Sequence, residues 1–162
     1  MKRVLLDDLN KEKAIPVYLS NRHKRWVYLP DPMTDMPILI CIDSIKNANA
    51  SFMDVVDEVF EKETVARIEK SFNLENGHLF TTKTLGQTIL ICGVIVIRTG
   101  MRVSPPIDAH ECVHVSQFIL SKQLTITDFK KVKDQELQAD TVERYFSILM
   151  QLRKYFRRSG GK

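Results

Sequence analysis

Two histidines and a glutamate stand close together in the segment "PPIDAHECVHVSQFI". His110 and His114 are four residues apart, and Glu111 directly follows the first histidine. On a helix, side chains at positions i and i+4 lie one turn apart on the same face. Two imidazoles in that arrangement can bind one zinc ion, and the neighbouring glutamate can take a proton from a metal-bound water. The segment therefore predicts a zinc-dependent hydrolytic site, with His110 and His114 as ligands and Glu111 as the general base.

A third ligand is needed, because catalytic zinc sites use three protein ligands and leave one position open for water. The segment "DQELQADTVERYF" offers three carboxylates at helical spacing, Glu136, Asp140 and Glu143. By helical angle they share a stripe that we expect to face inward, together with Val132, Ala139, Phe146 and Met150. Carboxylates on an inward face are costly unless a cation compensates them, and zinc would do so. The spacing alone does not decide which carboxylate reaches the metal.

The combination of HExxH with a later ExxxD on a second helix resembles the signature of the gluzincin metallopeptidases, of which thermolysin is the best-known member. The wording "ELQAD" is similar to the ExxAD of the HtpX-like and the small ImmA/IrrE-type peptidases. This resemblance implies that Glu136 is the third zinc ligand and that Asp140 hydrogen-bonds a ligand histidine, His110. It further implies Zn²⁺ as cofactor, a protein or peptide substrate, and a single zincin-like domain, which we place at residues 1–157.

A second hypothesis is open, because the chain offers no obvious match to the family's transition-state-stabilising histidine or tyrosine. The protein would then bind zinc without peptidase activity and act as a protein or nucleic-acid interaction module. The basic end "RKYFRRSGGK" could serve such a role, since basic clusters bind nucleic acid without sequence preference. We favour the simpler interpretation, in which these cations complement a helix dipole and residues 158–162 form a flexible basic tail.

Two helices must carry these side chains. The HExxH helix is expected to begin with Ser104 as its cap and Pro105 in its first turn, directly after the apolar strand "QTILICGVIVIRTG". In zincins, a sheet-edge strand near the site binds the substrate backbone, and this strand is the candidate. The final helix is expected to begin at a cap, Thr127 or Asp128, and to end near Phe156.

The preceding half of the chain predicts the sheet on which these helices pack. "IPVYL" and "RWVYLP" indicate a hairpin, and "PILICI" indicates a strand that is buried on both faces. Apolar positions at helical spacing predict one amphipathic helix from Ser51 to Phe72, and the Asn-Gly pair of "NLENGHLF" favours a second hairpin. The order predicts an α+β fold with a mostly antiparallel sheet, an active-site helix and a C-terminal helix that carries the third ligand.

The composition fits one soluble domain. The chain has 162 residues, of which 44% are hydrophobic and 27% charged, and its net charge is +4. Its apolar runs are too short to cross a membrane, and no signal-like segment develops at the N-terminus, so we expect a cytoplasmic protein without membrane contact. The three cysteines form neither a disulfide framework nor a CxxC pair, and we expect all three to be packing residues.

Overall fold

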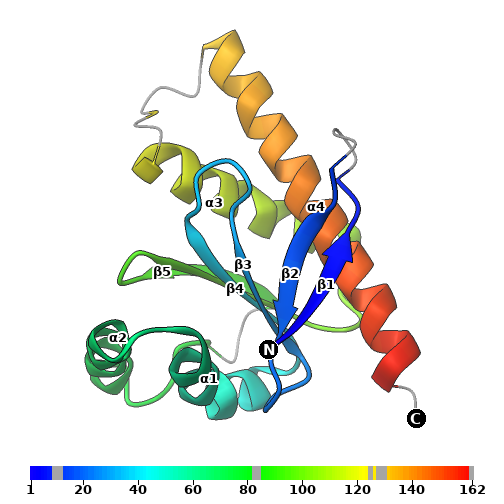
Figure 1. The fold of residues 1–162 in the computed structure, drawn as a ribbon. Coiled ribbons are helices and arrows are strands. Elements are labelled where there is room, and N and C mark those ends of the chain that lie inside the picture. Colours follow the sequence, from blue (N-terminus) through cyan, green and yellow to red (C-terminus); the bar gives the residue numbers. More distant parts are fainter. Residues whose placement is uncertain (9–12, 82–84, 124–125, 127–130, 161–162) are drawn as a thin grey trace.

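A six-stranded sheet with helices on both faces forms the fold (Figure 1). The computed structural model describes residues 1–8, 13–81, 85–123, 126 and 131–160. The strands are β1 (Lys2–Leu6), β2 (Ile15–Leu19), β3 (Trp26–Pro30), β4 (Pro37–Ile42), β5 (Gly86–Ile91) and β6 (Val94–Thr99). The helices are α1 (Ile45–Val59), α2 (Lys62–Leu74), α3 (Pro105–Gln123) and α4 (Val132–Gly160).

The strand order is β1-β2-β3-β4-β6-β5, which places β1 and β5 at the two edges. All neighbouring strands are antiparallel except β4 and β6, which are parallel. The prediction of an α+β fold with a mostly antiparallel sheet is therefore confirmed. The predicted hairpin is also confirmed as β2 and β3, and strand β1 was not predicted.

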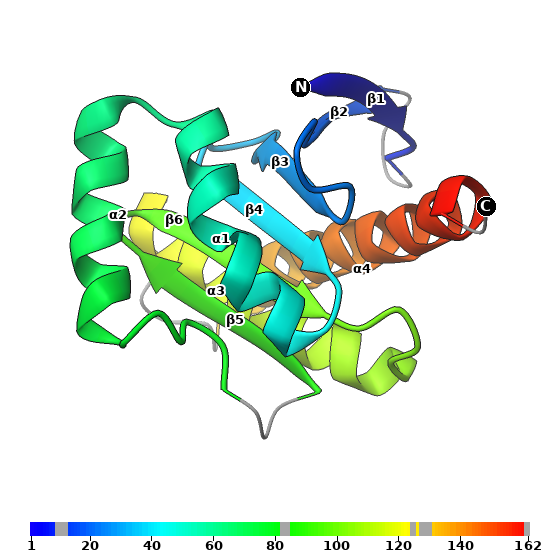
Figure 2. The same ribbon diagram turned by 90° about the horizontal axis from the view of Figure 1, so that it is seen from below.

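Two apolar layers hold the helices to the sheet, one on each face (Figure 2). Side chains alternate along β4, so that Ile38 and Ile40 pack toward α3 and α4, whereas Leu39 and Cys41 pack toward α1 and α2. "PILICI" is thus buried on both faces, as predicted. Among the helices that the structure describes, none combines the length and apolar character that a membrane crossing requires.

The apolar stretch before α3 is a hairpin, and the prediction of one continuous strand is wrong. Strand β5 ends at Ile91, β6 begins at Val94, and these two residues face each other in the antiparallel register. The two residues between them, Cys92 and Gly93, have φ angles of 48° and 79°. Such a pair of positive φ angles is the geometry of a two-residue hairpin turn. Cys92 is exposed at this turn, so it is not the packing residue that we expected, whereas Cys41 and Cys112 are buried.

Two further predictions for the middle of the chain are wrong. The single helix expected over residues 51–72 is divided into α1 and α2, because Phe60 and Glu61 adopt extended ψ angles of 161° and 156°. The Asn-Gly pair does not form a hairpin. Asn76 and Gly77 have positive φ angles in a turn that follows α2, where the backbone N–H of Gly77 donates to the carbonyl of Phe72.

Helix α3 begins at the predicted position, whereas α4 is longer at its C-terminal end than predicted. Helix α3 begins at Pro105, and the backbone N–H of Ile107 donates to the carbonyl of Ser104. Helix α4 continues to Gly160, beyond the predicted end near Phe156, so residues 158–160 are helical and the prediction that they belong to a flexible tail is wrong. The predicted caps of this helix, Thr127 and Asp128, lie outside the described residues.

Candidate metal site on helix α3

His110 and His114 point toward each other on α3. Their Nε2 atoms are 3.1 Å apart, and their ring centroids are separated by 4.7 Å. Two nitrogens that bind one tetrahedral zinc ion at its usual bond lengths would be about 3.3 Å apart. His114 is half-buried and His110 is exposed, so the pair lies at the border of the helix face that packs on the sheet. The two histidines therefore fit the first two positions of a zinc site.

Glu111 lies on the inner side of this pair and is only 5% exposed. Its Oε1 accepts a hydrogen bond of 2.8 Å from the hydroxyl of Thr88 on β5, the edge strand. The same hydroxyl lies 3.3 Å from the backbone carbonyl of Glu111. The carboxylate is thus held at a fixed place between α3 and the sheet edge.

A glycine permits this close approach of α3 to β5. A Cβ atom added at Gly86 would lie 3.1 Å from Cγ of Glu111 and 3.2 Å from Cγ2 of Ile107. Both distances are shorter than ordinary van der Waals contacts, so any larger residue would displace one of these side chains. Neither Gly86 nor Thr88 was predicted from the sequence to be part of the site.

A buried cation also lies near the glutamate. Arg98 on β6 is 3% exposed, and its guanidinium donates to the backbone carbonyls of Asp43 and Leu85. Burial lowers the pKa of Arg98, while nearby negative charges, Glu111 among them, oppose this change. Burial also raises the pKa of the Cys112 thiol, so this neighbour of Glu111 remains protonated at neutral pH.

An ion pair holds the first turn of α3. Asp108, two residues before His110, is 1% exposed and pairs with Arg153 of α4. Its Oδ1 accepts from Arg153 at 2.9 Å and from the hydroxyl of Thr99 at 2.9 Å, and Arg153 also donates to the carbonyl of Gly100. Arg153 is therefore not part of an exposed basic cluster, contrary to our expectation. It connects α4, β6 and the start of the histidine helix.

The three carboxylates of α4 lie on an exposed stripe, and the prediction that this stripe faces inward is wrong. Glu136, Asp140 and Glu143 are all exposed, and Met150 on the same stripe is 56% exposed. A different stripe packs against the sheet and α3, because it offers more apolar surface. This stripe consists of Tyr145, Ile148, Leu149, Leu152 and Phe156.

Tyr145 on this inner stripe also forms a buried hydrogen bond, since its hydroxyl donates to the carboxylate of Asp31. Burial raises the pKa of Tyr145, and the negative charge of Asp31 raises it further.

The described part of the chain contains no group of three or more His, Cys, Asp or Glu side chains arranged to hold one metal ion. His110 and His114 are brought together, whereas Glu136 does not complete a ligand set with them in this arrangement. The roles of Glu136 and Asp140 remain predictions. Comparisons with known protein families, curated proteins and solved structures found no match to this chain.

Proposed function

We propose that the protein is a zinc-dependent metallopeptidase in which His110 and His114 bind the metal and Glu111 is the general base. The observation that carries the proposal is the 3.1 Å separation of the two Nε2 atoms, close to the spacing that a shared zinc ion requires. Glu136 is the third ligand that we propose, and Asp140 orients a ligand histidine through a hydrogen bond.

The position of Glu111 supports its role. A bound zinc ion would supply a Lewis acid that makes a water molecule acidic near neutral pH. The hydroxyl of Thr88 donates a hydrogen bond to one oxygen of the Glu111 carboxylate. The other oxygen can accept a proton from the attacking water and pass it to the leaving amine. Because Glu111 is fixed between α3 and β5, it loses little conformational freedom when the reaction begins.

The position of β5 supports a peptide substrate. This strand pairs with β6 along one edge, and its other edge has no neighbouring strand among the described residues. An extended peptide could pair with such an edge through backbone hydrogen bonds. Thr88 lies on β5, so a peptide bound there would run beside the residues that contact Glu111.

Metal analysis and peptide hydrolysis test the proposal together. Protein purified without chelators is expected to contain about one zinc per chain, and His110→Ala or His114→Ala is expected to lose it. Glu111→Gln should keep the zinc and the fold but abolish cleavage of a peptide library, because it removes the base and no ligand.

A histidine outside α3 provides the control for the zinc measurement. His23→Ala removes a histidine that pairs with Asp54 on α1, away from α3, and should leave zinc content unchanged. Wild-type protein without zinc would refute the metal site. Stoichiometric zinc with no cleavage of any peptide would instead favour the interaction module over the enzyme.

A further inference from the structure

A pocket lies at the edge of the sheet opposite to the histidine pair. Its volume is about 580 Å³, within the range of small-molecule and nucleotide sites. It is formed by the start of β1, the turn between β2 and β3, and the last turns of α4. These three segments are far apart in the sequence, so no local sequence pattern predicts this pocket.

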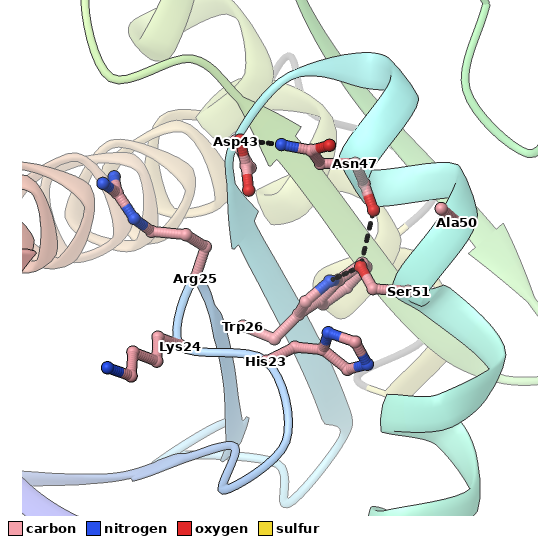
Figure 3. A pocket seen from close by; sticks show the side chains of 8 residues that line it. All are labelled: His23, Lys24, Arg25, Trp26, Asp43, Asn47, Ala50 and Ser51. Carbon is pink, nitrogen blue, oxygen red and sulfur yellow. Dashed lines mark hydrogen bonds between the residues drawn. The ribbon is translucent and has the colours of Figure 1, made fainter.

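The pocket wall is strongly basic. Lys2, Lys24 and Arg25 line it, and none of the residues that line it is acidic. Three carboxylates of α1 contact the same turn. Asp57 pairs with Arg22, Asp54 pairs with His23, and Glu58 accepts hydrogen bonds from two residues that line the pocket, Ser20 and Asn21. Figure 3 shows a separate pocket on the α1 side of this turn, which Lys24 and Arg25 also line, together with Asp43. In that view the ring of His23 is directed toward α1, whereas the side chains of Lys24 and Arg25 extend away from it. Lys24 and Arg25 thus extend from the turn on the side away from α1, where they line the basic pocket.

Aromatic side chains complete the wall. Tyr155 is half-buried, and its hydroxyl accepts a hydrogen bond of 3.4 Å from Nζ of Lys2. The guanidinium carbon of Arg25 lies 5.6 Å from the ring centroid of Phe156. Beyond the pocket, the last turns of α4 present further exposed cations, Lys154, Arg157 and Arg158. Cations at the end of a helix complement its dipole.

We propose that this pocket binds single-stranded nucleic acid, with phosphates at Lys24 and Arg25 and a base beside Tyr155. Sites of this kind combine a cationic groove for the backbone with aromatic side chains for the bases. An isolated phosphate would not need a pocket of about 580 Å³ or an aromatic wall. The proposal is independent of the zinc site, because the pocket shares no residue with it.

Fluorescence anisotropy with a labelled oligothymidylate of about 20 nucleotides tests this binding. If three phosphates are neutralised, the affinity should fall about 20-fold between about 50 mM and 200 mM salt, since each phosphate contact contributes about 0.7 to the logarithmic slope. The double variant Lys24→Gln/Arg25→Gln should bind about tenfold more weakly at low salt, and its slope should fall to about 0.7. Lys24 is exposed, so Lys24→Gln alone should fold normally and lower the slope by about 0.7.

Matched variants decide whether the pocket itself is responsible. Arg67→Gln removes the same charge from an exposed position on α2, which lies far from the end of α4 in both views (Figures 1 and 2). This control should bind like the wild type. Tyr155→Ala should weaken binding at least about fivefold, whereas Tyr155→Phe should retain it, because stacking uses the ring and not the hydroxyl.

Four results would overturn the proposal. The first is no binding at low salt, and the second is an equal loss in Arg67→Gln and in the double variant. The third is equal competition by inorganic polyphosphate of the same charge, which would show that the bases contribute nothing. Competition by a duplex as strong as that by the single strand would also contradict it, since a paired base cannot reach Tyr155.

Discussion

At the scale of single residues, the contact between Thr88 and Glu111 gives a direct test of the general base. Thr88→Val keeps the shape of the side chain but removes the hydroxyl that donates to Oε1 at 2.8 Å. We expect hydrolysis to fall about 10- to 100-fold, as it does when a positioning hydrogen bond is lost, while zinc content stays at the wild-type level. The measurement is kcat/KM on a peptide substrate, alongside metal analysis of the same sample.

Two companion variants check that the lost activity comes from this hydrogen bond. Thr88→Ser restores a hydroxyl and should recover most of the activity. Gly86→Ala keeps Thr88 but adds a Cβ 3.1 Å from Cγ of Glu111, so it should displace the carboxylate and also lower hydrolysis. Full activity in both Thr88→Val and Gly86→Ala would mean that Glu111 does not act from the position that the structure gives it.

The residues of this site differ in how far the sequence reveals them. The types and spacing of His110, Glu111 and His114 follow from one turn of helix, so the pair could be predicted from local sequence alone. Thr88 is 23 positions from Glu111 and meets it only because β5 is the edge strand beside α3. A threonine within an apolar strand carries no signal of such a contact, and neither does Gly86.

At the scale of whole elements, the ion pair between Asp108 and Arg153 fixes α3 against α4. Arg153→Met would leave the Asp108 carboxylate buried with its charge unpaired, although Thr99 would still donate to it. Removing one partner of a buried pair costs about 3–5 kcal/mol. We therefore expect the free energy of unfolding, measured by urea denaturation, to fall by about that amount.

A second substitution on the same helix provides the reference. Arg157→Met removes a like charge from an exposed position, and it should change the stability by less than about 0.5 kcal/mol. If Arg153→Met also lowered the free energy of unfolding by less than about 0.5 kcal/mol, the ion pair between Asp108 and Arg153 would contribute nothing to the position of α3. The start of the histidine helix would then be held by apolar packing alone.

Elements were predictable where one physical signal dominated. Strand β4 reads as a continuous apolar run because both its faces are buried, and α3 follows a serine and begins with two prolines. The β5–β6 hairpin was missed because its turn uses Cys92 and Gly93 in place of the usual Asn-Gly. The break between α1 and α2 contains neither glycine nor proline, so local sequence does not indicate it. On α4, both the stripe with Glu136 and the stripe with Tyr145 contain apolar residues, and helical angle alone did not show which of them packs against the sheet.

At the scale of the whole molecule, the two proposed sites lie at opposite edges of one sheet. The histidine pair and Glu111 adjoin β5, whereas the basic pocket adjoins β1 and the β2–β3 turn. Helix α4 is the element that both sites share, because its first half carries Glu136 and its last turns carry Tyr155. The zinc site is therefore complete only if the first half of α4 contributes a ligand to α3.

This dependence on α4 predicts that zinc stabilises the whole fold. A metal that binds only the folded chain adds about 2.7 kcal/mol of stability at a free concentration about 100 times its Kd. If Glu136 is the third ligand, chelation should lower the melting temperature of the wild type, and Glu136→Gln should remove both the zinc and this effect. Asp140→Asn should weaken zinc binding about 10- to 100-fold, because a ligand histidine loses its hydrogen-bonding partner.

Glu143→Gln is the matched control, because Glu143 lies on the same exposed stripe as Glu136 and bears the same charge. If zinc binding required only negative charge nearby, Glu136→Gln and Glu143→Gln would lower the zinc affinity equally. A metal that coordinates one carboxylate responds to that residue alone, and we expect Glu143→Gln to keep the zinc affinity and the melting temperature of the wild type. Loss of zinc in Glu143→Gln but not in Glu136→Gln would place the ligand seven residues, or about two helical turns, further along α4 than the gluzincin pattern implies.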